Sequence, residues 1–87
     1  MAKIIDKETS DKIRKLRADK ECVKIKKRGW MCEGTDDGLV FFNNNTEECV
    51  EVDINGNVIT SRNMFKTPLS AIEPFIKVEC EIARLVL

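Results

Sequence analysis

The chain has 87 residues, of which 43% are hydrophobic and 34% are charged, with a net charge of zero. These proportions are typical of folded globular proteins and exclude a chain that stays disordered through low hydrophobicity and high net charge. The length predicts one small domain over residues 1–87 with a thin core, because chains divide into separate cores only when they are much longer.

Several catalytic residue types are missing from the sequence. Histidine and tyrosine are absent, which removes the commonest general base, a common metal ligand and a phenolic acid. Three serines are present, but no Ser-x-x-Lys pattern supplies a lysine in place of the missing histidine. The four glycines are scattered and form no phosphate-binding loop. We therefore expect a protein that is not an enzyme and that binds no cofactor.

The spacing of the four cysteines excludes the usual zinc-binding motifs. Cys22, Cys32, Cys49 and Cys80 form no close pair of the kind that presents two thiolates to one zinc ion. No apolar leader and no stretch long enough to cross a membrane occurs, so we expect a cytoplasmic protein with reduced, buried thiols. The alternative is a reactive Cys32 with its pKa lowered by Arg28.

The first third of the chain predicts a helix followed by extended structure. Residues 6–20 contain no proline or glycine, and apolar side chains recur there at helical spacing on a narrow stripe. From residue 22 the period changes, because Val23 and Ile25 alternate with lysines. This alternation favours a bent strand or a short hairpin that ends with residues 30–32.

The middle of the chain predicts the main part of a sheet. Residues 35–38 read as a turn, and the apolar run 39–42 is typical of a central strand covered on both faces. Residues 49–54 alternate as a half-buried strand, and Asn55-Gly56 predicts a hairpin into residues 57–61. A two-residue turn and a three-residue loop with a glycine bulge remain open as alternatives for this hairpin.

The last third predicts helical structure. Thr67-Pro68 is a helix-start signature for a short turn through Ile72. Residues 74–87 fit both a strand and a helix, and we favour the helix because residues 83–85 break the alternation. The chain is thus predicted to be α+β, with an antiparallel sheet of three to five strands and helices at both ends. The expected core side chains are Trp30, Phe41, Phe42, Val50, Val52 and Phe75.

The zero net charge hides a strong asymmetry along the chain. Residues 1–28 hold eleven Lys and Arg against five Asp and Glu, whereas residues 29–87 hold four against ten. Residues 29–61 contain no Lys or Arg, and their seven acids are Glu33, Asp36, Asp37, Glu47, Glu48, Glu51 and Asp53. The interpretation that requires no binding function is that both regions are solvated, or that the basic helix folds over the acidic sheet.

The acidic sheet and loops suggest a protein-binding module. A negative surface without catalytic residues can dock on the basic groove of another protein, and such grooves are common in enzymes that handle nucleic acids. The leading hypothesis is therefore a binding protein that uses the seven acids. It extends to an inhibitor of a nucleic-acid-handling enzyme, of the kind that mobile elements encode against host defence.

The basic region supports a second hypothesis, in which the protein binds nucleic acid. Cations beside an aromatic ring are typical of single-strand binding sites. The predicted first helix adds further cations. A chain with one basic and one acidic region is also able to associate with itself, for example as a homodimer. The residues of the nucleic-acid hypothesis are Lys24, Lys26, Lys27, Arg28 and Trp30.

Overall fold

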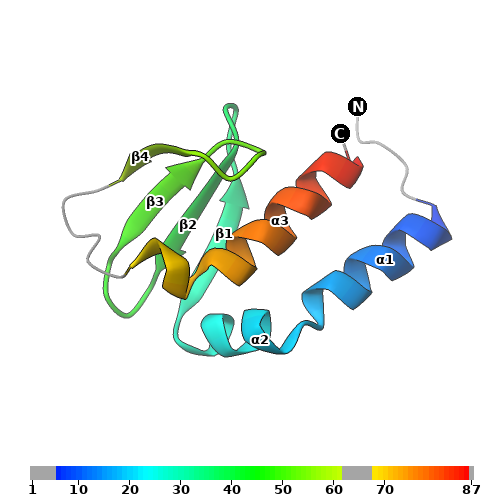
Figure 1. Cartoon of the computed structure of the whole chain (residues 1–87), viewed down its shortest axis with the longest axis horizontal. Helices are drawn as coiled ribbons and strands as arrows, with labels where there is room; N and C mark the ends of the chain where they lie inside the picture. Colours follow the sequence, from blue (N-terminus) through cyan, green and yellow to red (C-terminus); the bar gives the residue numbers. More distant parts are fainter. Residues whose placement is uncertain (1–5, 62–67, 87) are drawn as a thin grey trace.

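The structure is a computed structural model that describes residues 6–61 and 68–86. It has the predicted α+β architecture, with helices near both ends of the chain and an antiparallel four-stranded sheet in order β1-β2-β3-β4 (Figure 1). The described elements are α1 (Lys7–Arg17), α2 (Lys20–Lys27), β1 (Trp30–Gly34), β2 (Leu39–Asn43), β3 (Cys49–Val52), β4 (Val58–Ser61), the 3₁₀ turn η1 (Leu69–Ala71) and α3 (Glu73–Val86).

The predicted extended segment at residues 22–25 is wrong, because these residues belong to α2. Asp19 caps this helix by accepting hydrogen bonds from the backbone N–H groups of Glu21 and Cys22. Cys22 and Ile25 are one helical turn apart and both are buried. The helix ends at Lys27 with Arg28 as its C-cap residue, and the next residue, Gly29, has a φ of 103° that suits glycine. The residues at both ends of this segment and the buried i, i+3 pair favour a helix. An alternation of only four residues is too short to favour a strand against them.

The hairpin between β3 and β4 has the three-residue loop with a glycine bulge. The backbone N–H of Asp53 donates to the carbonyl of Asn57 at 2.9 Å, which leaves Ile54, Asn55 and Gly56 as the loop. Gly56 has a φ of 88°, where a side chain would be strained. This choice fixes the register left open by the sequence, with Val52 opposite Val58.

Only one face of the sheet is covered by a described helix. Phe41 and Phe75 meet edge to face, with ring centroids 5.2 Å apart, between β2 and α3. The side chains of β2 alternate accordingly, since Phe41 is fully buried and Phe42 is half-buried on the opposite face. The expectations that β2 is covered on both faces and that Phe42 is a core residue are therefore wrong. The other five expected core residues are buried.

α3 forms the centre of the helical layer, with the sheet on one side and α1 and α2 on the other (Figure 1). The prediction of a helix in this segment is confirmed. The expected short turn is also present, but Pro68 is its N-cap residue and not its first helical residue, and Thr67 lies outside the described residues. α1 has no buried residue and is joined to α3 by an ion pair between Arg17 and Glu79 at 3.5 Å. None of the described helices is both long and apolar enough to span a membrane.

A buried asparagine ties the loop between β2 and β3 to the end of α2. Asn43 is 4% exposed, and its Oδ1 accepts hydrogen bonds from the backbone N–H groups of Asn45 and Thr46. Its Nδ2 donates to the carbonyl of Arg28, which also accepts from Asn45 Nδ2. The buried side chain of Asn43, the last residue of β2, therefore holds the exposed loop that follows it.

Gly38 provides a direct test of how the two loops at one end of the sheet pack together. A Cβ atom at Gly38 would lie 2.1 Å from the backbone oxygen of Val52, whereas one at Gly34 would meet nothing within 4 Å. We expect Gly38→Ala to lower the free energy of unfolding by about 1–3 kcal/mol, because backbone atoms must move. Gly34→Ala is the matched control and should change it by less than about 1 kcal/mol. Urea unfolding of both variants measures the difference, and equal stabilities would contradict the described packing.

Candidate protein-docking face

One face of the sheet is covered by no helix of the described residues and carries both apolar and acidic side chains. Residues directly opposite one another on paired strands share a face, and the face of Phe42 is opposite to that of Phe41. We call this surface the open face. It is formed by Met31 and Glu33 of β1, Val40 and Phe42 of β2, and Cys49 and Glu51 of β3.

The open face is ordered into two rows that cross the strands. One row is apolar and runs Met31, Phe42, Cys49, and the second runs Glu33, Val40, Glu51. Met31 is 46% exposed and Glu33 is exposed, while the other four are half-buried. Because two strand spacings separate β1 from β3, the two glutamates lie about 10 Å apart. The face thus presents two carboxylates on an apolar floor, and this floor distinguishes it from a purely solvated charge cluster.

Three more of the predicted acids lie at one end of the sheet. Asp36 and Asp37 are exposed in the loop between β1 and β2, and Asp53 follows β3. All three line a hollow of about 620 Å³ that also includes Ile82 and Val86 of α3. The carboxylate of Asp53 accepts hydrogen bonds from the backbone N–H groups of Asn55 and Asn57, so it also holds its own loop.

The remaining two predicted acids lie at the opposite end of the sheet, in the loop that joins β2 to β3. Glu47 is exposed and has a φ of 64°. Glu48 is only 5% exposed, and its Oε1 accepts a 2.7 Å hydrogen bond from the hydroxyl of Thr46. The fold therefore divides the seven acids into three groups. Glu48 is too deeply buried to offer much surface to a partner, so its position is structural.

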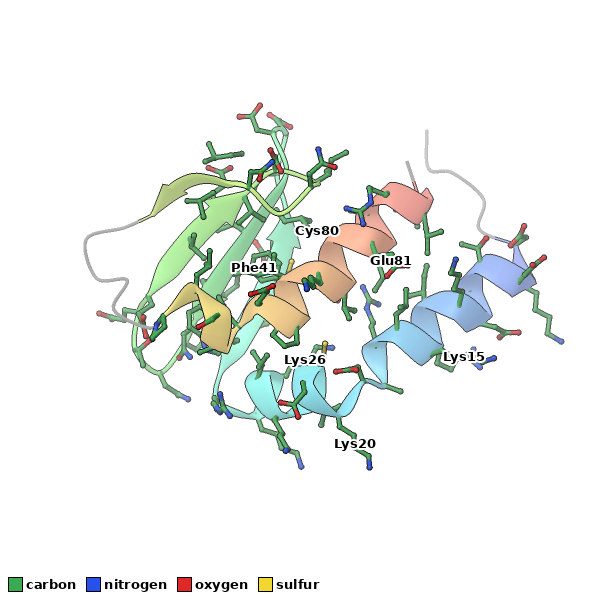
Figure 2. All side chains as sticks on the ribbon, in the orientation of Figure 1. Lys15, Lys20, Lys26, Phe41, Cys80 and Glu81 are labelled. Atoms are coloured by element: carbon green, nitrogen blue, oxygen red, sulfur yellow. The ribbon has the colours of Figure 1, made fainter. Side chains whose placement is uncertain are left out.

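Basic side chains gather on a separate face formed by α2. Lys20, Lys24 and Lys27 are spaced by four and three residues, so they form one stripe opposite the buried Cys22 and Ile25. Figure 2 shows Lys20 pointing away from α3 and from the sheet. The stripe was hidden in the sequence because Lys20 was predicted as the end of the first helix, whereas Lys24 and Lys27 were predicted in an extended segment, in which neighbouring side chains point to opposite faces.

Two residues of the nucleic-acid hypothesis have packing positions. Trp30 is 4% exposed within the core cluster, so its ring is not available as a stacking platform. The ammonium of Lys26 lies 5.6 Å from the centre of the Phe75 ring. Lys24, Lys26, Lys27 and Arg28 are exposed, and Lys26 lines a hollow that also includes Trp30. Of the five predicted residues, Trp30 is therefore the one that is withdrawn from solvent.

The expectation of buried thiols holds for two of the four cysteines, whereas Cys32 and Cys49 are half-buried. Cys22 and Cys80 are buried, and none of the four forms a disulfide. Burial raises the pKa of Cys32 to about 12 and that of Cys22 to about 11, with smaller contributions from neighbouring carboxylates. A thiol with so high a pKa is protonated at neutral pH, so the environment of Cys32 disfavours the activation by Arg28 that the sequence suggested.

Neither a metal-binding cluster nor a related protein identifies a further site. Within residues 6–61 and 68–86, no group of three Cys, Asp or Glu side chains is placed to hold a metal ion. Comparison of the chain with protein-family models, curated protein sequences and solved structures found no match. The open face and the basic stripe are thus the two surfaces on which functional inference rests.

The apolar part of the open face could not be identified before the strand register was known. Glu33 and Glu51 were predicted as site residues, but Met31, Phe42 and Cys49 were not. The alternation at residues 49–52 carries a signal for β3, since it places Cys49 and Glu51 together. The apolar run of β2 gives no signal for which side chains lie on the open face, because both faces of this strand are equally apolar.

Asp53 gives a pH-dependent test of the loop at the acidic end of the sheet. Hydrogen bonds from Asn57, and then from Asn55 and Gly56, hold the pKa of Asp53 below its ordinary value of 3.8. A lower pKa in the folded chain means that ionised Asp53 stabilises the fold above pH 3.8. This contribution is lost as the pH falls through the lower folded value. We expect Asp53→Asn to flatten the acid side of the stability profile measured by thermal unfolding between pH 2 and 7, and an unchanged profile would contradict this role.

Proposed function

We propose that this protein is a binding protein without catalytic activity and that its open face docks on the basic surface of another protein. The observation that carries the proposal is the row Glu33, Val40, Glu51 beside the apolar row Met31, Phe42, Cys49. Protein interfaces combine such an apolar centre with charges at its rim, which fix orientation and speed encounter.

The absence of cations in this part of the chain supports the choice of a basic partner. Residues 29–61 hold seven acids and no Lys or Arg, so no cation from these strands and loops neutralises the face. Asp36 and Asp37 at the end of the sheet are exposed and extend the negative charge beyond the open face. A positively charged partner would be steered towards this side of the molecule, most strongly at low ionic strength.

The class of partner that we propose is an enzyme that handles nucleic acids. Such enzymes carry a basic groove that neutralises phosphates, and an acidic protein seated in the groove would exclude the nucleic acid. An inhibitor that works in this way needs no catalytic residue, which agrees with the lack of histidine and the high pKa of Cys32. Inhibition of a host-defence nuclease is the most specific form of the proposal.

The exposed lysines of α2 favour a second candidate function. Lys20, Lys24 and Lys27 form a stripe able to contact a phosphate backbone without base recognition. This function would lack the predicted aromatic stacking, because Trp30 is buried. Its affinity for nucleic acid should therefore come from charge alone and fall steeply with salt.

Inhibition assays with purified nucleases test the leading proposal. We expect the protein, in 100-fold excess, to inhibit at least one member of a panel of restriction endonucleases and RNA-guided nucleases. Added non-substrate DNA should compete with the inhibition. Replacing both face carboxylates, Glu33→Lys with Glu51→Lys, should raise the concentration for half-inhibition at least tenfold, because it places cations against the basic groove.

A charge-matched control separates the open face from net charge. Glu8→Lys with Glu81→Lys makes the same change in charge on α1 and α3 and should leave inhibition within about twofold of the unmodified protein, while circular dichroism verifies that both variants fold. Full activity of every nuclease in the presence of the unmodified protein would refute the inhibitor proposal. Equal inhibition by the face variant would refute the assignment of the open face. Salt-sensitive binding of labelled single-stranded DNA that is abolished by Lys20→Glu with Lys27→Glu would favour the second candidate.

A further inference from the structure

We infer that the open face of one molecule binds the basic stripe of α2 on a second copy of the same chain, so that the protein associates head to tail at high concentration. The inference uses the same open face as the proposed function but does not depend on any external partner. It rests on complementarity in charge, spacing and apolar contact between two surfaces of one chain.

The charges of the two surfaces are opposite and separate in the fold. The open face carries Glu33 and Glu51, whereas α2 presents Lys20, Lys24 and Lys27 on the side turned away from the core. One α2 lysine has a neighbour of opposite charge, since Lys24 Nζ lies 3.7 Å from Glu21 Oε1. Both members of that pair are more than half exposed, so the pair is weak and does not block exchange to another carboxylate.

The spacing of the charges also agrees. Glu33 and Glu51 lie about 10 Å apart, because they are separated by two strand spacings. Lys20 and Lys27 are seven residues apart on a helix, which corresponds to about 10.5 Å along its axis. An α2 helix laid along the row Glu33, Val40, Glu51 would therefore place one lysine near each glutamate.

An apolar contact would lie between the two charge pairs. Val23 of α2 is 37% exposed and lies between Lys20 and Lys27 along the helix axis, at one edge of the basic stripe. In the same arrangement it would meet Val40, which lies between the two glutamates on β2. Contact with another copy would remove the remaining exposed surface of Val23 from water.

The small size of the open face predicts that this association is weak. Strands about 4.8 Å apart and about five residues long give the four-stranded sheet a projected area of roughly 300 Å². A stable interface buries about 800 Å² on each partner. Because the two surfaces are different faces of one molecule, the contact is heterologous and adds further copies rather than closing a two-fold dimer.

Sedimentation equilibrium of the purified protein from about 10 µM to 1 mM tests this inference. At low salt the weight-average mass should rise with concentration above that of one chain, and about 0.5 M NaCl should abolish the rise because it screens the charge pairs. A protein that remains monomeric at 1 mM in low salt would overturn the inference.

Charge exchange between the two surfaces identifies the contact. The stripe variant, Lys20→Glu with Lys27→Glu, and the face variant, Glu33→Lys with Glu51→Lys, should each remain monomeric, because both of their surfaces then carry the same sign. An equimolar mixture should associate again, since each altered surface finds its complement on the other variant. The control Glu8→Lys with Glu81→Lys should associate like the unmodified protein. Self-association of the stripe variant alone or of the face variant alone would overturn the inference. A mixture of the two variants that does not associate would also overturn it.

These results are independent of the nuclease assays. Self-association of the purified chain in the absence of any inhibition would support this inference and refute the inhibitor. Inhibition by a protein that remains monomeric would support the inhibitor and overturn this inference.

Discussion

The structure depends on the contact between α3 and one face of the sheet. Phe41 of β2 and Phe75 of α3 meet at its centre, and the surrounding core includes Val50 and Ile72. Among the described helices, α3 occupies the inner position against the sheet, and α1 and α2 pack on it. Among the described elements, none is left to cover the other face of the sheet.

This constraint explains the composition of the open face. In a sheet with one exposed side, the exposed positions are commonly polar, and Glu33 and Glu51 follow that rule. Met31, Phe42 and Cys49 do not follow it, since they keep apolar atoms on the side without a described helix. Apolar side chains at such positions have a cost in water that contact with another protein would remove, which is the physical basis of the docking proposal.

The sequence predicted the elements whose signals are local and redundant. The helix at residues 6–20 and the strand at residues 49–54 each combine a period with a boundary residue, and each is present with shifted ends. The turn at residues 35–38 was predicted from its residue types and joins β1 to β2. α2 was missed because the alternation of Val23 and Ile25 is too short a signal against the N-cap at Asp19 and the positive-φ glycine at residue 29. The acids of the candidate site were visible in the composition. Their division into three groups and the burial of Glu48 depend on the strand register, which the sequence does not determine.

The most direct measurement of the central claim is a nuclear magnetic resonance titration of the ¹⁵N-labelled protein with an arginine-rich 20-residue peptide at low and high salt. Our account predicts amide shift changes concentrated at the open face, at Met31, Glu33, Phe42 and Glu51, which disappear at about 0.5 M NaCl. Shift changes confined to the exposed acids of the helices, or their absence at millimolar peptide, would contradict the claim that the open face binds basic partners.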